Sequence, residues 1–405
     1  MDQEQIPPPV RKNRYPSRSP GVFAGIKLFS LAGIPVYARP SLLVVLVMLM
    51  ALFGLEFFPR EYENAGYGAA VYVLMGAAGA MLFFLSVLVH EVAHCLLART
   101  QLGGRIPIRR ITLFFLGGLT EMTEEPRTAG GEFMISLAGP FASVALGALM
   151  WSGAALLGHT GTPVYVTGVL NYIGYLNVFL GVTNLLPGFP LDGGRVLRAI
   201  IWHATGDFVK ATGVSTVAGR ALGYGAIGAG LVLVVATGGR LFLQAMFLTM
   251  VGFFFERSAR QVMDFVRART ALSGLRVLDA MQTNPPCVRE GTTLDEAVNR
   301  YMIPYNAEAL PVLDDAGQLR GVLTARMLEK VPSSEWGAAK AGDILGHEAL
   351  PGFVRPEEPL PSVYTLMTRY GLAALPVLDR ELRLAGLITF RNLYRMAAFR
   401  AHMTR

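Results

Sequence analysis

The sequence predicts an α-helical multi-pass membrane protein, with about six transmembrane helices and a short β-hairpin, followed by a soluble α/β domain. Of the 405 residues, 52% are hydrophobic and only 16% are charged, and the mean hydropathy is +0.43. These values lie well outside the soluble globular average. The last third of the chain is less apolar, carries more charge and contains an internal repeat. The chain therefore divides into a membrane part and an appended soluble part.

Six apolar stretches predict the membrane-spanning helices, and the last two are separated only by residues 237–240, which predicts a helical hairpin. They cover residues 41–58, 70–97, 132–157, 164–186, 221–236 and 241–255. Residues 1–40 predict a basic tail whose start is disordered. Arginines also follow the second and sixth stretches, and basic connections favour the cytoplasmic side. We therefore expect a cell-membrane protein whose two termini and soluble domain are cytoplasmic. The net charge of +7 is interpreted as an orientation signal and not as nucleic-acid binding.

The second stretch ends in two histidines four residues apart, His90 and His94, with Glu91 beside the first. On a helix both imidazoles share one face, so both can bind one metal ion. Glu91 is placed to take a proton from a water on that ion. Titratable side chains at membrane depth are costly and therefore functional by default. The position along the helix predicts a metal site near the cytoplasmic face.

The fourth stretch runs into a segment rich in proline and glycine, residues 184–195, that contains Asp192. Such a break is tolerated at membrane depth only where the backbone is buried in protein or lines a cavity. Two histidines and one carboxylate leave a fourth zinc position open for water, as in catalytic sites. The alternative is that Asp192 caps the next helix. We favour ligation because the histidine pair lies on the same side. Cys95 is interpreted as a small apolar residue, and His203 as a surface or interface histidine.

The connection after the second stretch contains a β-branched and aromatic segment, residues 111–116, followed by Gly117 and Gly118. This pattern predicts a strand with a turn. Two interpretations remain open. The strand is either an edge that pairs with an unwound peptide segment by strand addition, or a structural hairpin that lines the site.

The soluble part contains an internal repeat. The segment Ala309-Leu310-Pro311-Val312-Leu313-Asp314 recurs at 374–379, and at the same offset Gly321 and Thr324 match Gly386 and Thr389. Each copy predicts a helix, a strand, a turn, a strand and a helix. One such unit is small, so two are expected to pack together around a shared core.

Residues 1–256 resemble the site-2 protease family of intramembrane zinc metalloproteases. The resemblance rests on the His90–His94 motif and on residues 184–194. It implies one Zn2+ per chain, bound by His90, His94 and Asp192, with Glu91 as the general base. It also implies that Asn184 lies near the site and helps to hold substrate or the oxyanion.

A further family element, Ala-Gly-Pro, matches residues 138–140. The asparagine that often follows this element is Ser143 in this chain. The domains are then a tail over 1–40, a protease domain over 41–256 and a linker over 257–274.

The repeat resembles a tandem pair of cystathionine-β-synthase (CBS) domains, over residues 275–332 and 337–398. Such pairs often bind adenine nucleotides, so ATP or AMP is the implied regulator. Thr389 and Asn392 fit the family's ribose-contacting pattern, whereas Thr324 is followed at the same spacing by Met327. The second copy is therefore expected to supply most of the contacts. CBS pairs commonly associate, which implies a homo-oligomer.

The resemblance implies an enzyme that hydrolyses a peptide bond in or next to a transmembrane segment of a membrane-tethered protein, surrounded by lipid. This is regulated intramembrane proteolysis. The alternative is a transporter or channel regulated by CBS domains, in which the buried titratable residues form an ion path. The position of Glu91 and the proline–glycine break argue against transport, which does not need this spacing. A degenerate protease acting as a scaffold is disfavoured by the complete set of ligands and base.

Overall fold

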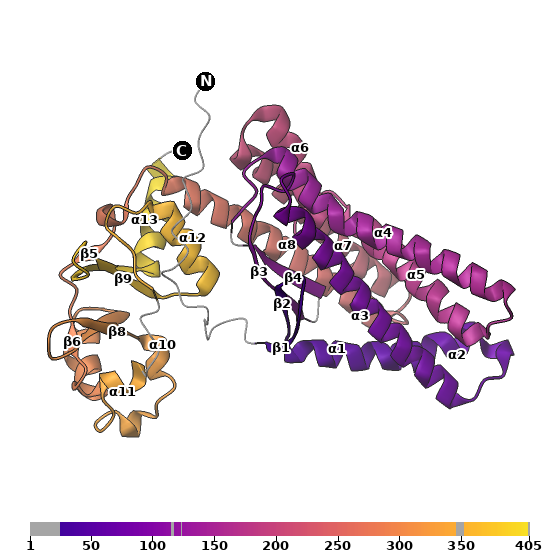
Figure 1. Cartoon of the computed structure of the whole chain (residues 1–405), viewed down its shortest axis with the longest axis horizontal. Helices are drawn as coiled ribbons and strands as arrows, with labels where there is room; N and C mark the ends of the chain where they lie inside the picture. Colours follow the sequence, from indigo (N-terminus) through magenta and orange to yellow (C-terminus); the bar gives the residue numbers. More distant parts are fainter. Residues whose placement is uncertain (1–24, 115–116, 123, 346–351, 404–405) are drawn as a thin grey trace. The chain divides into compact units, whose positions relative to one another are not determined.

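The computed structural model describes residues 25–403 except 115–116, 123 and 346–351. It divides into a membrane unit that ends at Asp264 and a C-terminal unit that begins at Phe265. Each unit is described by itself (Figure 1). The start of the predicted basic tail, residues 1–24, lies outside the described residues.

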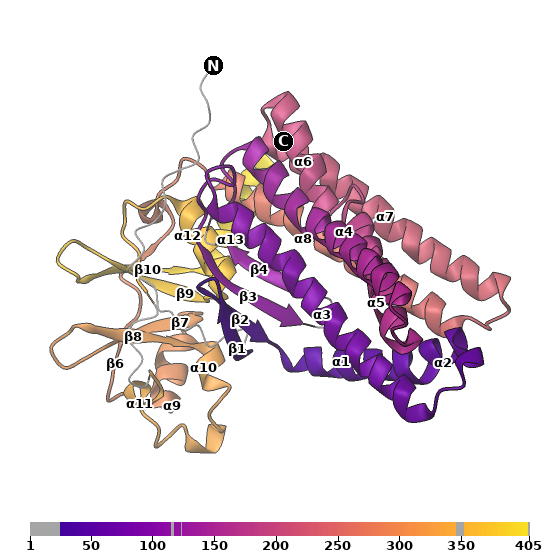
Figure 2. The ribbon, with the colours of Figure 1, turned by 45° about the vertical axis from the view of Figure 1, so that its right-hand side comes forward.

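The membrane unit consists mainly of long helices. They are α1 (Pro40–Ala51), a π-helical turn (Leu52–Phe57) and α2 (Phe58–Glu61), which run on directly, followed by a 3-10 turn (Glu63–Ala65), α3 (Ala69–Arg99), α4 (Ala129–His159), α5 (Val164–Asn184), α6 (Asp192–Thr205), α7 (Phe208–Ala236) and α8 (Phe242–Ala271). Helices α3, α4 and α5 pack together along their lengths (Figure 2).

Five helical segments among the described residues are long and apolar enough to cross a membrane: Pro40–Glu61, α3, α4, α5 and α7. They contain the first, second, third and fifth predicted stretches and cover the fourth as far as Asn184, which confirms the multi-pass fold. Helix α7 begins well before the predicted residue 221. Its first half carries Thr212, Ser215 and Thr216, which lower its hydropathy but are buried in the unit. The sixth predicted stretch lies in α8, which is not among the five, because its apolar run ends at Glu256.

A four-stranded sheet accompanies the helices, in the order β1 (Ile26–Leu31), β2 (Ile34–Ala38), β3 (Ile108–Phe114) and β4 (Gly117–Met122). The prediction of a tail over 1–40 is wrong for residues 26–38, which form β1 and β2. Their two-residue turn has left-handed φ at Ala32 (50°) and Gly33 (74°). Hairpin turns of this kind favour positive φ at both central residues. Alanine does not mark such a turn in a sequence.

Strand β3 is internal in this sheet. It pairs parallel with β2 and antiparallel with β4. The interpretation of residues 111–116 as an edge is therefore wrong for β3, and the interpretation as a structural hairpin holds. Residues 115–116 lie outside the described part of the chain. Ile111 is fully buried in a cluster with Cys95, Ala98 and Ile135, which packs the sheet on α3 and α4.

The C-terminal unit contains two three-stranded sheets, in the orders β6-β7-β8 and β5-β10-β9. The strands are β5 (Gln282–Thr283), β6 (Val288–Arg289), β7 (Ala309–Leu313), β8 (Leu319–Thr324), β9 (Ala374–Leu378) and β10 (Leu384–Thr389). The helices are α9 (Leu294–Glu296), a π-helical turn (Ala297–Met302), α10 (Ala325–Leu328), α11 (Ala341–Leu345), α12 (Leu360–Tyr370) and α13 (Phe390–Met403), with 3-10 turns at Val277–Asp279 and Ser333–Glu335.

The two copies of the sequence repeat also pair their strands in the same register. Ala309 pairs with Thr324 in the first copy, and Ala374 pairs with Thr389 at the equivalent positions of the second. A buried cluster of Ala309, Val322, Ala374 and Leu387 joins the two copies. The predicted shared core is therefore present.

Leu375→Ala is expected to destabilise the C-terminal unit by about 2–5 kcal/mol, because Leu375 is fully buried and its truncation leaves a cavity. Hydrogen exchange of the β9 and β10 amides in the full chain measures this loss. Leu278→Ala is the matched control, since Leu278 is 45% exposed. Equal protection in both variants would contradict the packing described here.

Candidate metal centre

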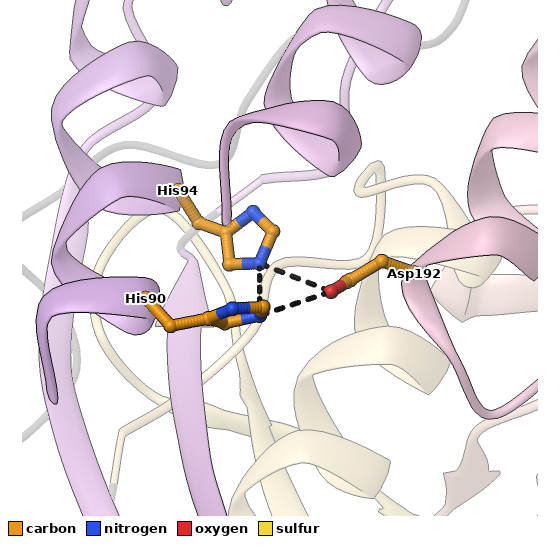
Figure 3. Close-up of side chains that lie close together, drawn as sticks. All are labelled: His90, His94 and Asp192. Carbon is orange, nitrogen blue, oxygen red and sulfur yellow. Dashed lines mark hydrogen bonds and ion pairs between the residues drawn. The ribbon is translucent and has the colours of Figure 1, made fainter. Parts of the chain in front are cut away.

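His90, His94 and Asp192 converge in the membrane unit and form the one group of potential metal ligands found among the described residues (Figure 3). We call them the His–His–Asp cluster. The Nε2 nitrogens of His90 and His94 lie 3.2 Å apart. Asp192 Oδ2 lies 3.1 Å from Nε2 of His90 and 3.3 Å from Nε2 of His94. Both histidines are buried. The structure thus brings together the three residues that the sequence selected.

The spacing of the cluster fits a zinc ion. Zinc binds imidazole and carboxylate ligands at about 2.0–2.2 Å in a tetrahedron. Two ligands of such a tetrahedron lie about 3.3–3.5 Å apart. The three separations in the cluster, 3.1 to 3.3 Å, are close to this value. Three protein ligands also leave one position for water, as catalytic zinc sites require.

Helix α4 contacts both imidazoles at Nδ1, the nitrogen that faces away from the cluster, and so orients the rings. The Nδ1–H of His94 donates to the carbonyl oxygen of Ile135 at 2.6 Å, and Nδ1 of His90 lies 2.9 Å from Ser143 Oγ. An Nδ1–H that donates a hydrogen bond fixes the tautomer and leaves the Nε2 lone pair free for a metal. Ser143, whose position departs from the family pattern, therefore contacts a candidate ligand. Neither contact is visible in the sequence, because the partners lie 41 and 53 residues apart.

The same helix approaches the cluster closely at Gly139. A Cβ atom at this position would lie 2.2 Å from Nε2 of His94 and 2.6 Å from Nε2 of His90. Both distances are far below van der Waals contact. Only glycine therefore lets α4 pass while the imidazoles keep their positions. The Ala-Gly-Pro element was the sequence signal for this approach.

Asp192 begins α6 and does not cap it. Leu191 occupies the N-cap position, and no side chain caps the helix. The Asp192 carboxylate instead faces the two histidines. A carboxylate in the first turn of a helix is also stabilised by the helix dipole. The alternative interpretation of Asp192 as a helix cap is therefore not what the structure shows.

Glu91 lies beside the cluster without being part of it. Its Oε2 accepts a hydrogen bond of 2.7 Å from Thr120 Oγ1 on strand β4. A Cβ at Gly118 of the same strand would lie 2.3 Å from Cγ of Glu91. Strand β4 therefore forms a wall against this carboxylate. Thr120 gave no signal in the sequence.

The other residues singled out in the sequence lie elsewhere. The side-chain amide of Asn184 donates to the carbonyl oxygen of Leu180, so its proposed role stays a prediction. Cys95 is buried and His203 is exposed, and neither joins the cluster. In the C-terminal unit, Thr389 Oγ1 accepts the backbone N–H of Asn392 at 3.3 Å. Thr324, at the start of α10, makes no capping hydrogen bond with its side chain.

Gly139→Ala is expected to lower zinc affinity by at least about tenfold, because the added methyl group displaces the imidazoles. Gly153→Ala on the same helix is the matched control, since nothing lies within 4 Å of its Cβ position. Zinc per chain after dialysis against a chelator measures the effect. Equal zinc retention by both variants would contradict the geometry of the cluster.

Comparisons with known proteins identify the families of both parts of the chain. The model of peptidase family M50 matches residues 78–165 and 160–224, and the CBS domain model matches 277–333 and 343–398. The chain is 33% identical to a protein of Mycobacterium tuberculosis named as zinc metalloprotease Rip3, over 82% of this chain and 83% of that protein. It is 28% identical to a protein of Synechocystis named as zinc metalloprotease sll0528, over 90% and 93%.

Among solved structures, the site-2 protease of Methanocaldococcus jannaschii is 27% identical to this chain. The match covers 59% of this chain and 95% of that protein, with a TM-score of 0.39. Family assignment rests on the family model and on the long alignment with the mycobacterial relative. The chain therefore belongs to peptidase family M50, the site-2 type of membrane zinc metalloprotease, and carries a C-terminal pair of CBS domains.

Proposed function

We propose that the chain hydrolyses a peptide bond in or next to a transmembrane segment of a membrane-tethered protein, with zinc held by the His–His–Asp cluster. The observation that supports this proposal most directly is that donor atoms of two buried histidines and of the partly buried Asp192 lie 3.1 to 3.3 Å apart. The carboxylate of Glu91 lies at the next helix position after His90. Bound zinc supplies Lewis-acid activation of a water molecule and of the scissile carbonyl.

Glu91 is the general base in this proposal. It removes the proton from the attacking water and delivers it to the leaving amine. The hydrogen bond from Thr120 holds the carboxylate in place before the substrate arrives. Ser143 and the carbonyl of Ile135 hold the imidazoles in the orientation that leaves Nε2 free.

Strand β4 is the proposed receiver of the substrate. A peptide bond in a helix has its carbonyl occupied, so the substrate segment must unwind before it is cut. Strand β4 is the last strand of its sheet and contacts Glu91 through Thr120. An extended segment added along β4 would gain main-chain hydrogen bonds next to the base. Asn184 remains the proposed residue for holding substrate or the oxyanion.

The orientation follows from charge. Arginines cluster in the connection between α3 and α4 and at the end of α8: Arg99, Arg105, Arg109, Arg110, Arg127, Arg257, Arg260, Arg267 and Arg269. Basic connections favour the cytoplasmic side. We therefore place the His-containing end of α3, both termini and the CBS domains at the cytoplasmic side of the cell membrane.

We further propose that an adenine nucleotide binds the CBS pair and controls proteolysis, and that the CBS domains associate as a homo-oligomer. Thr389 is buried at the start of α13, where its hydroxyl already meets the N–H of Asn392. The equivalent Thr324 has Met327 at the corresponding position, which offers no hydrogen bond to a ribose. The second copy is therefore the better nucleotide site.

Glu91→Gln is expected to keep one zinc per chain and to lose cleavage of a model transmembrane substrate by about 10²–10⁴-fold, because the amide cannot accept the proton. Glu63→Gln, which removes the same charge from an exposed position, is the control. Cleavage by the Glu91 variant at the normal rate would exclude Glu91 as the base.

Thr389→Val is expected to weaken ATP or AMP binding by about tenfold through loss of a ribose hydrogen bond, and Thr324→Val to change it little. Isothermal titration calorimetry on the full chain measures both. The two positions correspond in register, so the pair is a matched comparison. Equal affinities in the two variants would argue against the second copy as the nucleotide site.

A further inference from the structure

A buried ion pair that the proposed mechanism does not use connects α4 to α6. Glu132, in the first turn of α4, is fully buried, and Arg198 of α6 is 6% exposed. Arg198 Nε donates to the two carboxylate oxygens at 3.0 and 3.3 Å, and its Nη2 also contacts Oε1. Arg195 Nε lies 3.7 Å from the same Oε1. Two guanidinium nitrogens of Arg198 thus contact one carboxylate, and both side chains are shielded from solvent.

Two aromatic rings hold the guanidinium group in place. Arg198 Cζ lies 5.1 Å from the ring centre of Phe189 and 4.6 Å from that of Phe208. Phe189 belongs to the loop before Asp192, and Phe208 begins α7. A guanidinium that lies over rings and binds a carboxylate has its orientation restricted in several directions. This restriction extends to the loop that leads into α6.

The pair lies on the two helices that shape the metal centre. Asp192 is the first residue of α6, and Arg198 follows within two turns of the same helix. On α4, Ile135 comes one turn after Glu132 and accepts the hydrogen bond from His94. The first turns of α4 therefore make both contacts. The carbonyl of Ile135 orients His94, and Glu132, one turn earlier, binds the helix that begins with Asp192.

We propose that Glu132 and Arg198 are positioning residues that set the Asp192 carboxylate against the two histidines and thereby tune zinc affinity. This inference rests on the proposed role of the His–His–Asp cluster. A purely structural pair would instead stabilise the fold without a separate effect on the metal. The two cases differ in whether zinc affinity changes more than the stability of the zinc-free chain.

The test uses the full chain in detergent and compares Arg198→Lys with Arg260→Lys. Arg260 bonds Glu256 on α8 in the same unit, so the control makes the same change in another Glu–Arg pair. Lysine keeps the positive charge but loses the planar fork. We expect Arg198→Lys to weaken zinc binding by about tenfold to a hundredfold. We also expect it to alter the visible absorption bands of the cobalt-substituted protein, whereas Arg260→Lys changes neither.

A second variant, Glu132→Met with Arg198→Met, removes both buried charges together, which often preserves stability. Zinc affinity should again fall, while thermal unfolding of the zinc-free protein stays near that of the wild type. Zinc affinity within threefold of the wild type in Arg198→Lys, or a loss that only parallels lost stability, would overturn the positioning role. Asp192→Asn is measured alongside. If it binds zinc normally, the ligand assignment itself fails, which is a separate result.

Discussion

The candidate metal centre depends on the packing of three titratable side chains, two of them buried, against one another within an apolar helix bundle. Groups of this kind are costly at membrane depth unless they are paired or bind an ion. In the His–His–Asp cluster each facing atom has two partners within 3.3 Å. A divalent cation shared by all three would satisfy them together, which is why the cluster favours a metal over three separate hydrogen bonds.

Helix α4 organises this cluster although it supplies none of the three side chains. It contacts His94 through the Ile135 carbonyl and His90 through Ser143, and it passes close to both at Gly139. Strand β4, in the sheet, contacts Glu91 through Thr120. The two histidines and the candidate base lie on the same helix, α3, but their side chains form hydrogen bonds with different elements, α4 and β4.

The sequence predicted the parts of this arrangement that local spacing encodes. A spacing of four residues places His90 and His94 on one helix face, and the proline–glycine break marks Asp192. The internal repeat predicted two equivalent units around a shared core, and the structure adds that their strands pair in the same register. These features depend on neighbours in the chain or on internal repetition, so a single sequence contains the necessary information.

The contacts that the sequence did not predict are those between distant segments. Thr120 meets Glu91 from 29 residues away, and Arg198 meets Glu132 from 66. Strands β1 and β2 were missed because alanine occupies a left-handed turn position. Whether residues 111–116 form an edge stayed open, since the apolar pattern of β3 does not reveal that β2 pairs on its other side.

X-ray absorption at the zinc edge of the purified, zinc-loaded chain tests the central claim most directly, because it reports the ligand atoms themselves. The account predicts one zinc per chain with two imidazole nitrogens and oxygen ligands in its first shell. A sulfur ligand, which Cys95 would supply, or a single imidazole would contradict the His–His–Asp cluster as the zinc site.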